Sequence, residues 1–428
     1  GDYFEESPRA LAKFAFEQNA YSLVKNKLDT FMSSITSETL RKRFIERAIE
    51  CGKKEVVEEL SSWFQRTYSL KHLYDNMFNE RELMLLTEYF PEVGLPIIKN
   101  YIFSPDINLN DFGTNFTYKI RRHIVWTCEH LANFSQYFSQ CEEILFKLAQ
   151  HETETYISNN SQGTWCRLYS ILLSNTEVPY KKRFDILLKR ALVAEQSDAQ
   201  LFEKAFEIVF CNGTSVLVPP SIIGNKITPV SWKPKDYQEL VEIKKYTLNT
   251  LIENREKLSP KIISSICNAL FKTFHSFLEL AMLKEYRHTT DALMINQDQK
   301  NELSVLLEEN IRYLKHNNVQ EDTISFMQKW IDELRATDTN GRLHAFLTRD
   351  IYSYGYTDED REKKEKLVSA LAQEFIKGTD IVNKIGEIIK SPQYKEEAIS
   401  EFAEQLALND KKLELLTIIE EPPGISRN

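Results

Sequence analysis

The sequence predicts an all-α fold, an α-solenoid of irregular helical hairpins with one long loop near residues 211–235. The first observation is a scarcity of helix breakers. The chain has 12 Gly and 13 Pro in 428 residues, roughly half the usual share of these two residue types. Sheets and barrels need many tight turns, which Gly and Pro mostly supply. The second observation is that apolar residues recur at helical spacing along most of the chain.

Helical hairpins are predicted from the first residues onward. Ser7-Pro8 is expected to open a helix, since Ser is a favoured N-cap and Pro fits the first helical turn. A second helix is expected to end at Gly52, and a third to begin near Val56. Pairs of helices with short links are the unit of TPR-like and HEAT-like solenoids. No exact internal period is present, so the repeat is expected to be degenerate.

The longest stretch without helical periodicity is residues 211–235, which contains four of the 13 prolines. Loops of this length are uncommon inside folded domains and tend to be functional or mobile. Asp236 and Glu239 then have the spacing of a capping box, which predicts a helix from Tyr237 to about Leu258.

Three regions are predicted along the chain: an N-terminal helical subdomain (1–104), a central helical region that includes the loop (105–258), and C-terminal helical repeats (259–428). The irregular stretch 104–113 indicates a boundary between subdomains. Ser259-Pro260 has the pattern of a capped helix start. A charged stretch, 358–366, is expected to precede a helix over 367–376.

Composition excludes several classes of function. A net charge of −9 argues against broad nucleic-acid binding, which needs a cationic face. Six scattered cysteines without a C-x-x-C pair indicate free thiols in a reducing compartment, so we expect a cytoplasmic protein. The sequence has no apolar run long enough to cross a membrane and no signal peptide, so we expect no membrane association. Because the chain begins Gly1-Asp2, we expect it to be a segment cut from a longer protein.

The sequence contains no phosphate-binding P-loop, no G-x-G-x-x-G and no G-x-S-x-G motif. His123, Cys128 and His130 are the one tight group of soft ligands. The two histidines are seven residues apart, or about 10 Å along a helix, which is too far for one zinc ion. We therefore expect no catalytic, cofactor-binding or metal-binding residues. The competing hypothesis is an enzyme whose catalytic groups converge around the 211–235 loop.

Two short basic runs stand out, Arg121-Arg122-His123 and Lys181-Lys182-Arg183. Each could contact phosphate or an acidic partner. The simpler interpretation is ordinary exposed charge on helix surfaces.

Two stretches carry a family resemblance, residues 165–187 and 232–239. Their characteristic residues are Trp165, Leu168, Thr176, Pro179, Arg183, Trp232, Pro234 and Glu239. Their order, and the long loop between them, resemble the helical region after the nucleotide-binding module of bacterial STAND-class NTPases (signal-transduction ATPases with numerous domains). Residues 402–410 resemble a further helix of these proteins, with Ala403 and Ala407 where glycines are usual.

The resemblance implies a non-catalytic sensor and scaffold segment of an antiviral defence protein, without a cofactor. Such a segment binds a viral or other partner protein and couples binding to assembly and effector activation. The resemblance also implies contacts with upstream domains of the same chain, and it is compatible with a homo-oligomer. The alternative is a free-standing α-solenoid adaptor that scaffolds protein–protein interactions.

The motif residues are expected to act as a structural scaffold. Trp165 and Trp232 are large enough to pin the irregular loop against the helices on either side. Pro234 is expected to fix the point where the chain re-enters a helix. Arg183 and Glu239 are expected to pair and hold the loop.

Overall fold

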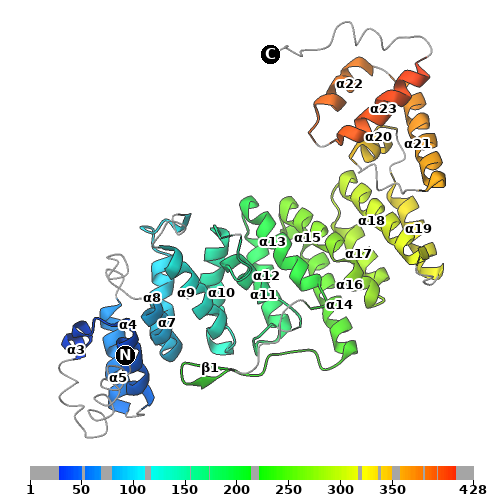
Figure 1. Ribbon diagram of the computed structural model, residues 1–428. Helices are drawn as coiled ribbons and strands as arrows, with labels where there is room; N and C mark the ends of the chain where they lie inside the picture. Colours follow the sequence, from blue (N-terminus) through cyan, green and yellow to red (C-terminus); the bar gives the residue numbers. More distant parts are fainter. Residues whose placement is uncertain are drawn as a thin grey trace, which may run out of the picture. The chain divides into compact units, whose positions relative to one another are not determined.

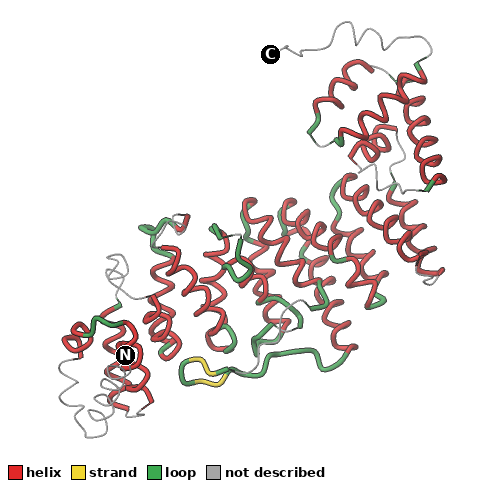
Figure 2. Tube along the Cα trace, viewed as in Figure 1, coloured by secondary structure: helices red, strands yellow, loops and turns green. Residues whose placement is uncertain are grey.

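The computed structural model describes residues 28–50, 54–68, 80–110, 117–154, 156–172, 174–213, 221–316, 321–335, 339–348, 357–378, 381–392 and 394–410. Within these ranges the chain forms 20 α-helices, and the one sheet is a two-stranded hairpin (Figure 2). The predicted all-α architecture of helical hairpins is therefore confirmed. The helix starts expected at Ser7-Pro8 and the helix end expected at Gly52 lie outside the described residues.

The chain divides into two compact units, Gly1–Leu293 and Met294–Asn428. This division differs from the three predicted regions. Across the predicted boundary at residue 104, α8 (Pro91–Ile102) packs against α10 (Ser135–Gln150). Across the boundary at residue 258, α13 (Ala199–Phe210) packs along α15 (Pro260–Lys272). Both junctions therefore lie within one continuous array of helices.

The first unit is a succession of helices that pack mainly against helices one to three places away in the chain (Figure 1). Its remaining helices are α3 (Leu28–Ser34), α4 (Glu38–Glu50), α5 (Lys54–Thr67), α7 (Glu80–Tyr89), α9 (Thr117–Leu131), α11 (Ser161–Arg167), α12 (Tyr180–Leu192), α14 (Tyr237–Glu253), α16 (Phe274–Glu279) and α17 (Leu283–Leu293). Short 3-10 turns, Gln196–Asp198 and Arg255–Lys257, join some of them.

Apolar stripes account for the packing. In α5, Val56, Leu60, Trp63 and Phe64 are buried, at the three-to-four-residue spacing of one helix face. The same spacing buries one side of α13 and one side of α15. Burial of such faces, more than helix propensity, stabilises helices of 10–16 residues.

Capping residues set several helix starts. Asp236 accepts a hydrogen bond from the Glu239 backbone N–H at 2.8 Å and opens α14 as predicted. Ser259 caps α15, with Pro260 in its first turn. The α14 helix is shorter than expected: it ends at Glu253 because the 3-10 turn takes over before Leu258.

Buried cations satisfy helix carboxyl ends in this unit. The last carbonyls of a helix have no partner within it. Arg121, fully buried in α9, donates to the Leu148 carbonyl near the end of α10 at 2.6 Å. Lys244, buried in α14, donates to three carbonyls at the end of α13: Val209, Phe210 and Cys211. Each cation thereby joins two helices.

The second unit contains α18 (Gln297–His316), α19 (Glu321–Leu334), α20 (Thr339–Thr348), α21 (Asp358–Ile376), α22 (Ile381–Lys390) and α23 (Glu396–Asn409). The α18 and α19 helices pack as a hairpin. Residues of α20 to α23 share a core that includes Phe346, Phe375 and Phe402.

The prediction for the charged stretch 358–366 is wrong in one respect. These residues are the first turns of α21 and do not precede it. Thr357 and Asp360 form a full capping box that begins the helix at Asp358. Asp358, Arg361, Glu362, Lys363, Glu365 and Lys366 are therefore exposed charged residues of a helix. Within the described part of the chain, no helix combines the length and apolar character needed to cross a bilayer.

Candidate functional site

The irregular segment 211–235, called the arm below, leaves α13 and enters α14. Its described residues are 211–213 and 221–235. Strands β1 (Ile222–Ile223) and β2 (Lys226–Ile227) pair antiparallel, with Ile222 opposite Ile227. Figure 1 shows the hairpin well away from α13 and α14, beside one end of α7.

The hairpin is seated on the carboxyl end of α7. Gly224 has a φ of +60°, which favours glycine. A Cβ at this position would lie 2.4 Å from the Glu88 carbonyl oxygen, so the close approach itself requires glycine. Lys226 Nζ lies 3.5 Å from the carbonyl oxygen of Tyr89, which precedes it by 137 residues. Ile223 is buried beneath the hairpin.

Hydrogen bonds close the base of the hairpin. The Thr228 backbone N–H donates to the Ser221 carbonyl at 2.9 Å, and the Ser221 N–H donates to Thr228 Oγ1 at 2.9 Å. Thr228 is buried. The hairpin therefore has a defined backbone in addition to its seat on α7.

Trp232 anchors the returning part of the arm. Its backbone N–H donates to the Thr176 carbonyl at 2.7 Å. Its ring stacks on Tyr180, with centroids 6.4 Å apart and planes 27° apart. The Arg183 guanidinium lies 5.9 Å from the Trp232 ring centroid and 5.6 Å from that of Tyr180. Trp232 thus holds the arm against α12.

Arg183 organises the turn beneath Trp232. It is fully buried and donates to three carbonyls of the chain between α11 and α12: Leu168 at 2.6 Å, Ser170 at 2.7 Å and Val178 at 2.9 Å. Burial lowers the pKa of Arg183 to about 10. The predicted Arg183–Glu239 pair is wrong, because Arg183 is committed to these carbonyls. The Glu239 carboxylate instead accepts from the Lys235 N–H at 2.6 Å.

Trp165 has a different role from the one predicted. It is fully buried, and its Nε1 donates to Glu142 at 3.0 Å. It has three aromatic neighbours: Phe146 of α10, Phe202 of α13, and Tyr169 in the turn that follows α11. Trp165 therefore joins three parts of the helical core, whereas Trp232 is the tryptophan that holds the arm.

The other motif residues lie around the same turn. Thr176 is buried and supplies the carbonyl for Trp232. Leu168 is buried and supplies a carbonyl to Arg183. Pro179 occupies the N-cap position of α12, and Pro234 lies two residues before the N-cap of α14. The structure thus brings Leu168, Thr176, Pro179, Arg183 and Trp232 together, and leaves Trp165, Pro234 and Glu239 outside the group.

The outer side of the arm carries apolar residues that the sequence reasoning missed. Ile222, Ile227 and Val230 are 73%, 74% and 82% exposed. A usable signal existed: Gly224-Asn225 between two isoleucine-containing pairs is a two-residue hairpin pattern. What the pattern could not show is that Ile223, on the opposite side, is buried and that Gly224 lies against the Glu88 carbonyl of α7.

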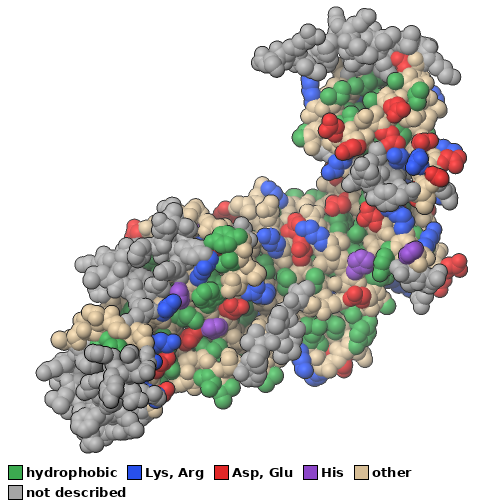
Figure 3. All heavy atoms as spheres, in the orientation of Figure 1, with side chains coloured by type: hydrophobic (Ala, Val, Ile, Leu, Met, Phe, Trp, Pro, Cys, Tyr) green, Lys and Arg blue, Asp and Glu red, His purple; other side chains and the backbone are tan. Residues whose placement is uncertain are grey.

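Neither basic run is exposed along its whole length, although Lys181 and Lys182 are exposed. Arg121 and Arg183 are buried, and Arg122 pairs with Glu154 at 3.1 Å. Figure 3 shows acidic and basic side chains interspersed over the visible face.

His130 Nδ1 lies 2.6 Å from Glu88, which raises the pKa of the histidine.

The described residues include no group of three or more His, Cys, Asp or Glu side chains placed to hold a metal ion. Two larger cavities, of about 580 and about 370 Å³, are lined by residues of the second unit and not by the arm. Comparisons with protein-family models, with curated proteins and with solved structures each find no match to this chain.

Proposed function

We propose that this chain is a non-catalytic helical scaffold that binds a partner protein through the arm. The observation that carries the proposal is the exposed trio Ile222, Ile227 and Val230 on a backbone held at both ends. Single exposed apolar residues are common on protein surfaces. Here two isoleucines face each other across a hairpin whose other side includes the buried Ile223.

A held backbone favours binding. A flexible loop loses conformational entropy when a partner orders it, and this loss weakens affinity. The arm is already positioned by Gly224 on α7 and by Trp232 on Tyr180. Exposed apolar side chains on such a support can be buried at small entropic cost.

The arm also suits a sensor. It contacts α7 near one end and the Thr176 turn near the other, so a bound partner acts on distant parts of the array together. A partner that prefers one arrangement of these parts shifts the population toward it. This behaviour fits the sensor segment of a bacterial antiviral STAND-class protein that recognises a viral protein.

The test is site-specific photo-crosslinking in bacterial cells that express the chain, with and without phage infection. A photo-reactive residue replaces Val230 on the arm. The matched control replaces Val193, which is 79% exposed at the end of α12. We expect an adduct at position 230 that forms on infection, and we expect Ile222→Ser with Ile227→Ser to abolish it.

The outcomes separate the hypotheses. A host-protein adduct at position 230 that is the same in both cultures would favour the adaptor function. Equal, unspecific labelling at positions 230 and 193 would show that the arm is no binding surface.

A further inference from the structure

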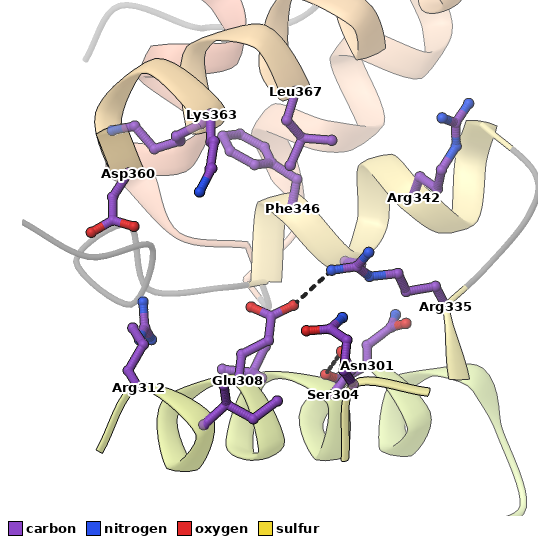
Figure 4. Close-up of a pocket in the computed structure, with 15 residues that line it drawn as sticks. Asn301, Ser304, Glu308, Arg312, Arg335, Arg342, Phe346, Asp360, Lys363 and Leu367 are labelled. Atoms are coloured by element: carbon purple, nitrogen blue, oxygen red, sulfur yellow. Dashed lines mark hydrogen bonds and ion pairs between the residues drawn. The ribbon is translucent and has the colours of Figure 1, made fainter. Parts of the chain in front are cut away.

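We infer that the second unit contains a binding site for a small phosphate-bearing ligand, in a cavity between the α18–α19 hairpin and helices α20 and α21 (Figure 4). The cavity volume is about 580 Å³, within the range of small-molecule sites. This inference does not depend on the arm or on its partner.

Positive charge dominates the lining. The cavity is lined by five Arg or Lys side chains and by two carboxylates, Glu308 and Asp360. The cations come from separate elements: Arg312 from α18, Arg335 from the end of α19, Arg342 from α20, and Lys363 and Lys364 from α21. Figure 4 shows α18 below the cavity and α21 above it, with their labelled residues directed toward the space between.

Three of these cations are held by carboxylates. Arg335 lies 3.1 Å from Glu308, Lys364 lies 3.0 Å from Glu401, and Arg342 pairs with Glu374. These pairs reduce the charge available to a ligand but fix the positions of the side chains. In Figure 4 the Arg335 guanidinium extends across the cavity to Glu308, whereas Arg342 is directed away.

Arg312 is the cation available to a ligand. It makes no hydrogen bond and no ion pair with any described residue, although it is only partly exposed. Its long-range attraction to Asp360 lowers the pKa of that carboxyl, after the larger effect of the Thr357 hydrogen bond. A planar guanidinium in this position suits bidentate contact with a phosphate.

A buried amide supplies an independent indication of a ligand. Asn301 lines the cavity and is 6% exposed. Its Oδ1 accepts from Gln297 at 3.0 Å, but its Nδ2 has no hydrogen-bond partner among the described residues. A buried N–H without an acceptor is costly. A ligand oxygen in the cavity would accept this hydrogen bond.

The apolar part of the wall narrows the ligand class. Val305, Ile311, Phe346 and Leu367 line the same cavity. An inorganic anion would leave these side chains unused. The combination of cations, one amide donor and an apolar wall fits a phosphate ester with a ring or other apolar group, such as a nucleotide.

The experiment is calorimetric titration of the full chain with ATP, pyrophosphate and adenosine, at low and high salt. We expect ATP and pyrophosphate to bind, with affinity falling as salt rises, and adenosine not to bind. Arg312→Gln should weaken ATP binding about tenfold or more, the loss expected for one charge-assisted hydrogen bond. Lys366→Gln is the matched control, since Lys366 is exposed on α21 and pairs with Glu362 outside the cavity.

Circular dichroism of each variant checks folding. Arg312 and Lys366 are both at helix surfaces, so both variants should retain the spectrum of the parent chain. Absence of saturable binding for every phosphate probe would overturn the inference. So would equal ATP affinity in Arg312→Gln and Lys366→Gln, or adenosine binding as tight as that of ATP.

Discussion

Replacement of Trp232 by alanine tests whether the arm is held where the structure places it. The substitution removes the ring that stacks on Tyr180 and lies over Arg183, while the backbone hydrogen bond to Thr176 can remain. An aromatic pair contributes about 0.5–1.5 kcal/mol beyond burial, and a cation–π contact about 0.5–2 kcal/mol. The free energy of opening the arm should therefore fall by about 1–3 kcal/mol.

Hydrogen exchange followed by mass spectrometry measures this opening directly. A change of 1–3 kcal/mol corresponds to about 5–150-fold faster exchange for amides of residues 221–235. Amides of α19, in the other compact unit, should be unaffected. Tyr237→Ala is the control, because Tyr237 is an exposed aromatic residue directly after the arm.

Two results would refute the reasoning. Unchanged exchange of the arm in Trp232→Ala would mean that the ring does not hold it. Equal acceleration throughout the first unit would mean that Trp232 supports the helical core and has no particular role in the arm.

Three further substitutions test neighbouring features. Gly224→Val should displace the hairpin from α7, because its Cβ would meet the Glu88 carbonyl at 2.4 Å. Trypsin cleavage at Lys226 should then accelerate, and Asn225→Ala should leave it unchanged. Arg183→Met leaves three buried carbonyls without donors. The unfolding free energy of the first unit, measured by urea titration, should therefore fall by at least about 3 kcal/mol. A loss below about 1 kcal/mol would contradict the role of Arg183 as the donor to these carbonyls. Burial lowers the pKa of Lys244 to about 7, against about 10.4 in an unfolded chain. Between these two pKa values the unfolded state therefore binds more protons than the folded state. The unfolding free energy of the parent chain, relative to that of Lys244→Met, should rise from pH 7 to pH 10, by at most about 1.4 kcal/mol per pH unit. A pH-independent difference would show that the folded lysine stays charged.

Local features of this fold could be predicted from the sequence, and long-range ones could not. Asp236 and Ser259 indicated helix starts because capping depends on residues three apart. The irregular stretch 211–235 could also be predicted, because the loss of helical periodicity is a property of the local sequence. Its course was not, because the contact between Lys226 and Tyr89 spans 137 residues and involves a backbone carbonyl.

Arg183 shows why the expected pairing failed. Charge complementarity favours a carboxylate partner for an arginine, and Glu239 is the one acidic residue of the motif. The actual partners are carbonyls left unpaired by the irregular turn between α11 and α12. The cavity of the second unit was missed for a related reason: its cations come from four elements spread over residues 312–364, and they form no local motif.

The course of the arm has a mechanical consequence. In a simple solenoid each repeat touches only its neighbours, so a terminal repeat can be cut away or pulled off without disturbing distant ones. Here the arm, which connects α13 to α14, also contacts α7. The helices from α8 to α13 therefore lie within a loop of chain that this contact closes. A truncation that removes α7 would remove the carbonyls against which Gly224 and Lys226 lie. Stretching the array would have to detach the hairpin before these helices could separate.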